Sequence, residues 1–325
     1  MPSHIAHNKI YKDVFSELPE RMKKEHRYTW SKYKIFAEGH DLIYSFLLAA
    51  PHKAIKYYKE LPRIRDSEIQ ALSINYIDRL YESNQLDETK LFLYGYLIHH
   101  FFDAKLHPFI IYQTGDYMSS GEAGFYHQLL ENMIDALLIK RQGIKPKSYL
   151  IHTLVNTTES LTNDTRYVIR ESFYETYGYE KFDKLFANYN KNVKRWLLVM
   201  MHDPWGIKYY ASKPFSTFIK SIKALQACQF RFDGSEAEKY LNNERSQWNN
   251  PANKDDTCNK SFDDLYEESL AEISSMISLL DEAINDKANN NEIKSIVPNI
   301  SSTHGYEDPT LKLVYMKDNI NIRRK

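Results

Sequence analysis

Glycine and proline are scarce in this sequence, with 10 glycines and 11 prolines among 325 residues. Most segments between them carry apolar residues three and four positions apart, which is the spacing of a helix face, rather than in alternation. The sequence therefore predicts an all-α fold. A chain of this length could form two average domains, but large helical enzymes often share one continuous core, so we expect a single multi-helix domain.

Cysteine is almost absent, because the chain contains only Cys228 and Cys258. Two cysteines are too few for a disulfide framework, and these two lack the paired spacing of a thiolate metal site. Any metal site must therefore use histidine and carboxylate side chains. Hydrophobic residues make up 42% of the chain and charged residues 26%, which is the balance of a packed globular protein.

The chain has no excess of either charge, with 43 Lys and Arg residues against 43 Asp and Glu residues. No overall field would draw it to a nucleic acid or an anionic membrane, and we expect no stable nucleic-acid complex. It also lacks an apolar run of the roughly 20 residues that span a bilayer. The N-terminal segment has no basic stretch followed by an apolar one, so we expect a cytoplasmic protein without a signal peptide.

Apolar spacing and capping residues place the expected helices of the first part of the chain. The first helix begins after Ser3. Its buried stripe consists of His7, Ile10, Tyr11, Val14 and Leu18. A second helix, apolar nearly all round, covers about 88–106 and ends before Pro108, and a third follows Ser120. Further helices are expected near 148–161, 165–189, 191–202 and 212–228.

Two parts of one domain are expected, with 1–232 forming the helical metal-binding catalytic core and 233–325 packing on it. Residues 233–260 are polar and predict a long surface connection rather than a core element. A last helix begins after Ser261. Its apolar stripe consists of Phe262, Leu265, Leu270, Ile273, Ile277, Leu280 and Ile284. The tail after Asn289 is polar and is expected to be loose or partly strand-like.

Polar residues recur every four positions within the apolar second helix, at His99, Asp103 and His107. This spacing puts them one turn apart on one face, where they could bind metal ions with Asp103 as a bridge. Alternatively, His99 and Asp103 form only a local hydrogen bond and His107 ends the helix. The next helix repeats the arrangement with His127 and Glu131, and two such faces on successive helices favour a metal site.

Further candidates have simpler explanations when each is taken alone. His7 lies on an otherwise apolar stripe and needs an interior partner, which could be a metal ion or a hydrogen-bonding group. Asp41 would ordinarily be a helix N-cap, and His52, beside Pro51, would ordinarily be a surface loop histidine. These residues gain weight as ligands only together with the two helix faces.

The run from Tyr94 to Pro108 resembles the most specific signature of a known family, the bacterial zinc-dependent phospholipase C family, which is similar to fungal single-strand nucleases. That signature is His-x3-Asp-x3-His-Pro, and it selects His99 rather than His100 as its first histidine. The closing His-x3-Glu pair of the family is matched from His127 onwards.

Other motifs extend this resemblance over nearly the whole chain, since Asp203-Pro204-Trp205-Gly206 and Trp248-Asn249-Asn250-Pro251 resemble non-ligand segments of the family's C-terminal half. Residues 1–7 resemble the start of members without a signal peptide, in which the second histidine is a ligand. Gly39-His40-Asp41 is similar to a Gly-Pro-Asp motif, and His52 falls where a further ligand histidine follows. Because His40 stands where proline is usual, it would either add a ligand or fill space.

The resemblance implies a zinc-dependent phosphoesterase acting on a small-molecule or lipid head-group phosphate ester. The implied ligand sets are Asp41, His52, His99 and Asp103 for one ion, His107, His127 and Glu131 for a second, and His7 with the shared Asp103 for any third. Zinc would activate water for attack at phosphorus, and Asp41 or Asp135 would orient that water. Secreted relatives use a processed N-terminal amine as a ligand, whereas this chain opens at Met1, so we expect two tightly held zinc ions and a weakly held third.

Two other interpretations remain open. The His-Asp dipeptides at 40–41 and 202–203 suggest an HD-type helical phosphohydrolase, although that interpretation leaves His107, His127 and Glu131 without a role. A non-catalytic helical binding protein stabilised by a closed metal site would carry the same ligand types. Nothing in the pattern indicates an oligomeric state.

Overall fold

The structure is a computed structural model. The part of the chain that it describes is mainly helical, which confirms the all-α class. The described residues are 4–44, 64, 67–84, 86–117, 121–145, 149, 161–179, 182–184, 203, 207–216, 222, 226 and 235–317. The elements are α1 (His4–Glu17), α2 (Glu20–His26), η1 (Lys34–Tyr44), α5 (Ile69–Leu80), α6 (Leu86–Thr114), α7 (Gly121–Arg141), α8 (Asn163–Tyr177), α10 (Ile207–Ser216), η5 (Ser235–Tyr240), β1 (Trp248–Asn250), β2 (Asn253–Cys258), α12 (Phe262–Asn285) and α13 (Asn290–Ile296).

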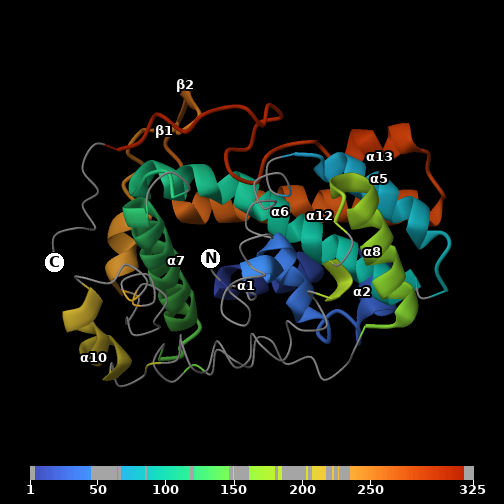
Figure 1. Ribbon diagram of the computed structural model, residues 1–325, viewed down its shortest axis with the longest axis horizontal. Helices are drawn as coiled ribbons and strands as arrows, with labels where there is room; N and C mark the ends of the chain where they lie inside the picture. The colour runs from blue at the N-terminus through green and yellow to red at the C-terminus, as the bar shows by residue number, and fades with distance from the viewer. Residues whose placement is uncertain are drawn as a thin grey trace.

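Helix α6 is the central element, and other elements pack along its length (Figure 1). It contacts η1, α1, α7 and α12, and α5 and α8 also touch it. Apolar side chains are buried on every side of this helix, as at Leu91, Tyr94, Leu97 and Phe102. A helix that is apolar all round must lie inside the protein, so polar residues such as His99, Asp103 and His107 on α6 are buried as well.

The prediction that this helix ends before Pro108 is wrong, because α6 continues to Thr114. Proline has no backbone N–H, so the carbonyl of Ala104 receives no helical hydrogen bond from it. Packing outweighs this local cost, since Phe109, Ile110 and Ile111 are all buried in the last turns. His107 therefore lies inside a helix and keeps its place on the same face as His99.

Helices α1, α7 and α12 confirm the predicted helices after positions 3, 120 and 261. On α1 the predicted stripe from His7 to Val14 is buried. Helix α12 begins with a capping box, in which the Ser261 hydroxyl accepts a hydrogen bond from the Asp264 N–H and the Asp264 carboxylate accepts from the Ser261 N–H. Its apolar stripe packs on α1 and α6.

The segment from 233 to 260 is not only a surface connection, which corrects the prediction. It contains η5 and an antiparallel hairpin in which Trp248 pairs with Cys258 and Asn249 with Thr257. Trp248 and Leu241 are buried in the core, and an aromatic side chain of that size offsets a polar surrounding sequence. The first part of the tail is not loose either, because it forms α13 and then places residues 301–304 in the interior.

Other predicted helices match less closely. Helix α8 begins at Asn163, two residues before the predicted 165–189, and ends early at Tyr177, where Gly178 in a left-handed conformation terminates it. Helix α10 starts before the predicted 212–228. The helices predicted near 148–161 and 191–202 lie almost wholly outside the described residues.

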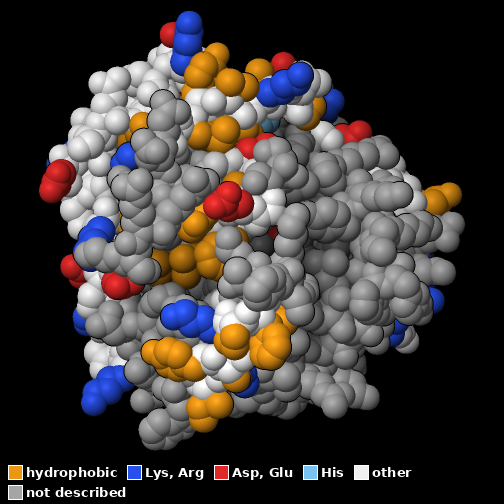
Figure 2. All heavy atoms as spheres, turned by 60° about the vertical axis from the view of Figure 1, so that its left-hand side comes forward, with side chains coloured by type: hydrophobic (Ala, Val, Ile, Leu, Met, Phe, Trp, Pro, Cys, Tyr) orange, Lys and Arg blue, Asp and Glu red, His pale blue; other side chains and the backbone are white. Residues whose placement is uncertain are grey.

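None of the helices in the described regions has both the length and the apolar character needed to cross a membrane. Figure 2 shows acidic, basic and apolar side chains interspersed on the described part of one face. That mixture agrees with the equal numbers of acidic and basic residues in the sequence.

Candidate metal centre

Buried histidine and carboxylate side chains from α1, η1, α6 and α7 lie close together. These side chains are His4 and His7 on α1, Glu38, His40 and Asp41 on η1, His99, Asp103 and His107 on α6, and His127 and Glu131 on α7. This set includes every metal ligand predicted from the sequence except His52, which lies outside the described residues. The structure also places His99 rather than His100 in the cluster, in agreement with the four-residue spacing.

Gly39 positions η1 against α6. Its backbone has a φ of 47° and a ψ of −130°, which interrupts the helical turns of η1 just before His40 and Asp41. A Cβ atom at this position would lie 2.6 Å from Cγ of His99, so no larger residue fits without displacing that ring. Next to this contact, Nδ1 of His99 donates a hydrogen bond to the Ala37 carbonyl oxygen at 2.8 Å.

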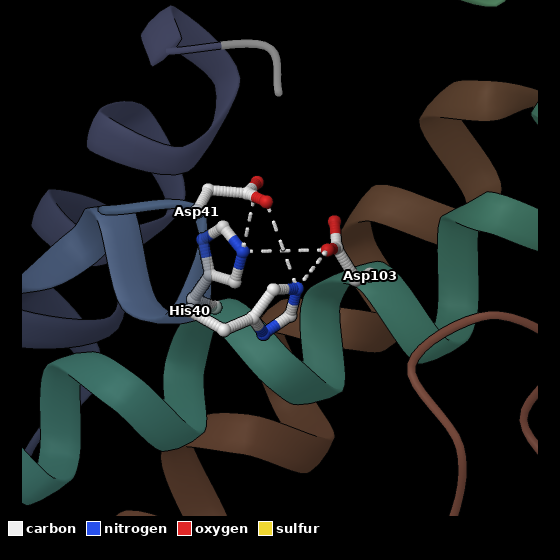
Figure 3. Close-up of side chains that lie close together, drawn as sticks. His40, Asp41 and Asp103 are labelled. Atoms are coloured by element: carbon white, nitrogen blue, oxygen red, sulfur yellow. Dashed lines mark ion pairs between the residues drawn. The ribbon is translucent and has the colours of Figure 1, made fainter. Parts of the chain in front are cut away.

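The first half of the site is formed by His40, Asp41, His99 and Asp103. Nε2 of His99 lies 3.2 Å from Oδ2 of Asp41 and 3.3 Å from Oδ2 of Asp103. Nε2 of His40 lies 3.6 Å from the same Asp103 oxygen and 3.8 Å from Oδ1 of Asp41. Figure 3 shows the side chains of His40, Asp41 and Asp103 pointing toward one another from η1 and α6.

The second half of the site is formed by His107, His127 and Glu131. Nε2 of His127 lies 3.0 Å from Oε1 of Glu131, and Nε2 of His107 lies 3.8 Å from the same oxygen. The donor atoms of these three residues are close enough to share one ion. The predicted pair on α7 thus faces the predicted run on α6.

Asp103 lies between the two halves and presents one oxygen to each. Its Oδ2 faces His99 and His40, whereas its Oδ1 lies 3.4 Å from Nε2 of His107. Oδ1 also accepts a hydrogen bond from Nε2 of His7 at 3.0 Å, and the His7 ring stacks on His99 with centroids 4.0 Å apart. This is the geometry of a carboxylate that could bridge two cations.

The charges in the first half hold one another in place in the absence of an ion. Burial disfavours a protonated His99, but Asp103 and Asp41 outweigh burial and raise its pKa to about 10. Burial alone would raise the pKa of Asp103, but His107, His99 and His7 hold it well below its usual range. Burial would likewise raise the pKa of Asp41, but His40 and His99 lower it below its usual range. Protons and buried ion pairs can therefore balance this cluster without a metal.

A metal ion nevertheless fits the donor set. Because Nδ1 of His99 must donate its hydrogen to the Ala37 carbonyl, Nε2 of the neutral ring has only a lone pair, and this lone pair faces two carboxylates. Three electron-rich atoms can approach this closely only around a proton or another cation. Buried imidazole nitrogens and carboxylate oxygens are the ligands that zinc prefers when thiolates are absent.

Two of the buried oxygens add to this fit. Oδ2 of Asp103 and Oε2 of Glu131 accept no well-directed hydrogen bond from any of the described residues. Buried carboxylate oxygens normally have such a partner, and those without one mark places where an ion or water completes the structure. The two oxygens lie in different halves of the site.

The structure reveals a second pair of ionisable residues that the sequence analysis missed. His4 and Glu38 are both buried, and Nδ1 of His4 lies 2.6 Å from Oε2 of Glu38. Burial opposes both charges, but each residue favours the charged form of the other, so the pKa of His4 is raised and that of Glu38 is lowered. The spacing of His4 one helical turn before His7 was the available signal.

Asp135 has a different position from the one predicted for a residue that orients water. Its two carboxylate oxygens accept hydrogen bonds from the backbone N–H groups of Ile5 and Ala6, at 3.2 and 3.0 Å. These N–H groups belong to the first turn of α1 and have no helical acceptor. Asp135 therefore ties α7 to the start of the helix that carries His4 and His7.

A separate group of Glu25, His26 and Asp281 also has the residue types of a metal site. Cations already occupy its surroundings, however, because Asp281 accepts hydrogen bonds from Lys90 and Arg21 as well as from the Tyr94 hydroxyl. The Lys90 ammonium and the Arg21 guanidinium, both beside the Asp281 carboxylate, repel any further cation there. We interpret this group as an ion-pair network that joins α2, α6 and α12.

Comparison with known proteins gives no independent guide to function. No protein-family model, curated protein or solved structure matches the chain.

Proposed function

We propose that this protein is a zinc-dependent phosphoric ester hydrolase of the phospholipase C type. The observation that carries the proposal is the position of His99 Nε2, which lies 3.2 Å from an oxygen of Asp41 and 3.3 Å from an oxygen of Asp103 while Nδ1 is committed to a backbone carbonyl. A second group of three ligand types stands on the other side of Asp103. Two adjacent cation positions that share a carboxylate are the arrangement used to hydrolyse phosphate esters.

The protein's own residues would hold and orient the reacting groups. Zinc bound at these positions would neutralise phosphate oxygens and lower the pKa of water toward about 7. Asp103 would fix the separation of the two positions through its two oxygens. The low pKa of Asp41 keeps it a carboxylate, so it can accept a hydrogen bond from an attacking water and orient that water. Burial of all these groups strengthens each of these interactions.

A phosphate ester of a small molecule or a lipid head group is the proposed substrate class. The equal numbers of acidic and basic residues provide no field for a polyanionic backbone. The charges of the site itself are suited to a single phosphate group, because two divalent ions would outweigh the three carboxylates of Asp41, Asp103 and Glu131.

The test combines metal content with hydrolysis. The full chain is loaded with zinc, freed of excess metal and analysed by mass spectrometry. It is then assayed with p-nitrophenyl phosphate, bis(p-nitrophenyl) phosphate and p-nitrophenyl phosphorylcholine. We expect about two zinc ions per chain and hydrolysis that is lost on chelation and restored by zinc. A chain that binds no zinc, or binds it and cleaves none of the three esters, would contradict the proposal.

The main alternative is a non-catalytic binding protein that zinc stabilises, and the complete burial of His99 and His40 is the observation in its favour. Unfolding measurements separate the two functions. A structural site makes the metal-free chain unfold, whereas a catalytic site leaves it folded but inactive. An HD-type hydrolase remains a weaker alternative, since it gives no role to His107, His127 and Glu131.

A further inference from the structure

His40 lies on η1 and belongs to the site, although the four-residue spacing of ligand types on α6 and α7 does not include it. Its ring is completely buried and lies perpendicular to the ring of His99, with centroids 4.6 Å apart. Its Nε2 atom points at the two carboxylates that His99 also faces (Figure 3). Space filling alone would require no such direction, because an apolar ring could turn either edge toward the site.

The distances within this group have the dimensions of a tetrahedral zinc site. Ligand atoms about 2.0 to 2.1 Å from a zinc ion at tetrahedral angles are separated from one another by about 3.3 to 3.4 Å. His99 Nε2 lies 3.2 Å from Asp41 Oδ2 and 3.3 Å from Asp103 Oδ2. His40 Nε2 lies 3.6 and 3.8 Å from oxygens of the same two carboxylates, so small rotations would complete the tetrahedron.

We infer that His40 is the fourth protein ligand of the ion held by Asp41, His99 and Asp103. This inference rests on the proposed function only in requiring zinc at that position. His40 then takes the role that the sequence analysis gave to His52. The set of two imidazoles and two carboxylates carries two negative charges, which balance one zinc ion.

Four protein ligands would hold the ion beside His40, and His107, His127 and Glu131 would hold the second ion together with Oδ1 of the shared Asp103. Because Asp103 contributes to both positions, loss of the ion beside His40 would also disturb the second position. Hydrolysis would then depend on His40 through the retention of one ion.

Metal retention in matched variants tests this assignment. His40→Gln keeps a polar side chain of similar reach, and His100→Gln is a matched control because His100 is equally buried but donates to the Ile300 carbonyl instead. Zinc per chain is counted after gel filtration, and affinity is measured by competition with a chromophoric chelator. We expect His40→Gln to bind one of the two ions more than about 100-fold more weakly, since even outer-shell changes cost about 10- to 100-fold. His100→Gln and His52→Gln should retain both ions.

Retention of both ions with native affinity in His40→Gln would overturn the assignment, as would loss of one ion in His52→Gln but not in His40→Gln. Circular dichroism of the metal-free variants shows whether they fold.

If His40→Gln does not fold, the native chain loaded with cobalt tests the same assignment without a variant. Intense visible absorption from four-coordinate cobalt is expected, and only the weak absorption of six-coordinate cobalt would overturn the assignment. A native chain without any bound metal would refute the proposed function itself, whereas these outcomes refute only the role of His40.

Discussion

Nδ1 of His107 donates a hydrogen bond to the carbonyl oxygen of Ser302, 195 residues further along the chain, at 2.9 Å. This bond leaves Nε2 of His107 to face Asp103 and Glu131. The Ala37 carbonyl does the same for His99. Backbone carbonyls thus fix the tautomer and direction of His99 and His107, as is usual for the outer contacts of metal-binding imidazoles.

Residues 300–306, which we call the strap, should control metal binding at His107. Gly305 in the strap has a φ of 78°, and a Cβ atom there would lie 2.9 Å from the Ala104 carbonyl oxygen. Gly305→Ala should therefore displace the strap and move the Ser302 carbonyl away from His107. We expect a fall of about 10- to 100-fold in the affinity for one zinc ion, measured by chelator competition.

Gly178→Ala is the matched control for the strap. Gly178 has a φ of 72°, and nothing lies within 4 Å of an added Cβ atom. Both substitutions should cost about 1 to 2 kcal/mol of stability through backbone strain alone. If both variants bind zinc like the native chain, the strap does not orient His107.

Asp103→Asn should lose at least one zinc ion and essentially all hydrolysis. An amide offers one neutral oxygen in place of two charged ones, so it cannot serve both halves of the site. Metal content and turnover of p-nitrophenyl esters are measured on the same sample. Unchanged metal content and turnover would show that Asp103 is only an ion-pair partner of the surrounding histidines.

Two zinc ions, and not three, should remain after extensive dialysis. His7 is the predicted ligand of a third ion, but its Nε2 already donates a hydrogen bond to Oδ1 of Asp103, the oxygen that also faces His107. A position with so few ligands of its own would bind weakly. His7→Ala should accordingly still retain two zinc ions after dialysis, although loss of its hydrogen bond to Asp103 should weaken their binding. Three ions retained by the native chain would contradict this expectation.

Asp281→Asn should lower stability without changing zinc content. Asp281 is completely buried and accepts hydrogen bonds from Lys90, itself 3% exposed, and from Tyr94. Removing the charge leaves Lys90 buried with weaker partners, and we expect a cost of about 3 kcal/mol in denaturant unfolding. Asp263→Asn on the same helix, whose pair with Arg141 is exposed, should cost less than about 1 kcal/mol. Loss of zinc in Asp281→Asn would reveal a metal site there.

The capping box of α12 should contribute stability that disappears in acid. The Ser261 N–H, together with Arg245, lowers the pKa of Asp264 from 3.8 to about 2. A carboxylate with a lowered pKa stabilises the fold above pH 3.8 and loses that contribution as the pH falls through about 2. The difference in unfolding free energy between the native chain and Asp264→Asn should therefore shrink over that range. Ser261→Ala should cost about 1 kcal/mol at neutral pH.

Sequence patterns predicted those parts of the fold whose structure is determined by residues close together in the chain. The stripes of α1 and α12 and the cap at Ser261 follow from side-chain spacing and capping chemistry within a few residues. The end predicted at Pro108 failed because burial of the following apolar residues outweighs a lost hydrogen bond. The polar segments around Trp248 and Ser302 offered no periodicity, since distant contacts decide their structure.

The same distinction holds for the candidate site. Spacing identified His99, Asp103 and His107, because one helix fixes their relative positions. Spacing could not identify the carbonyls of Ala37 and Ser302, since every residue type carries a carbonyl and only the folded chain selects these two. The role of His40 was left open for a related reason, because its direction depends on the kink at Gly39.

The two oxygens of Asp103 also make the proposed metal positions a linked equilibrium. An ion on the Oδ2 side sets the rotation of the carboxylate and hence the placement of Oδ1, which faces His107. Thermodynamic linkage makes such an influence reciprocal, so each ion changes the affinity for the other by the same factor. Any substitution that weakens one half, including one at His40, should therefore be detectable as a shifted zinc titration of the half it does not touch.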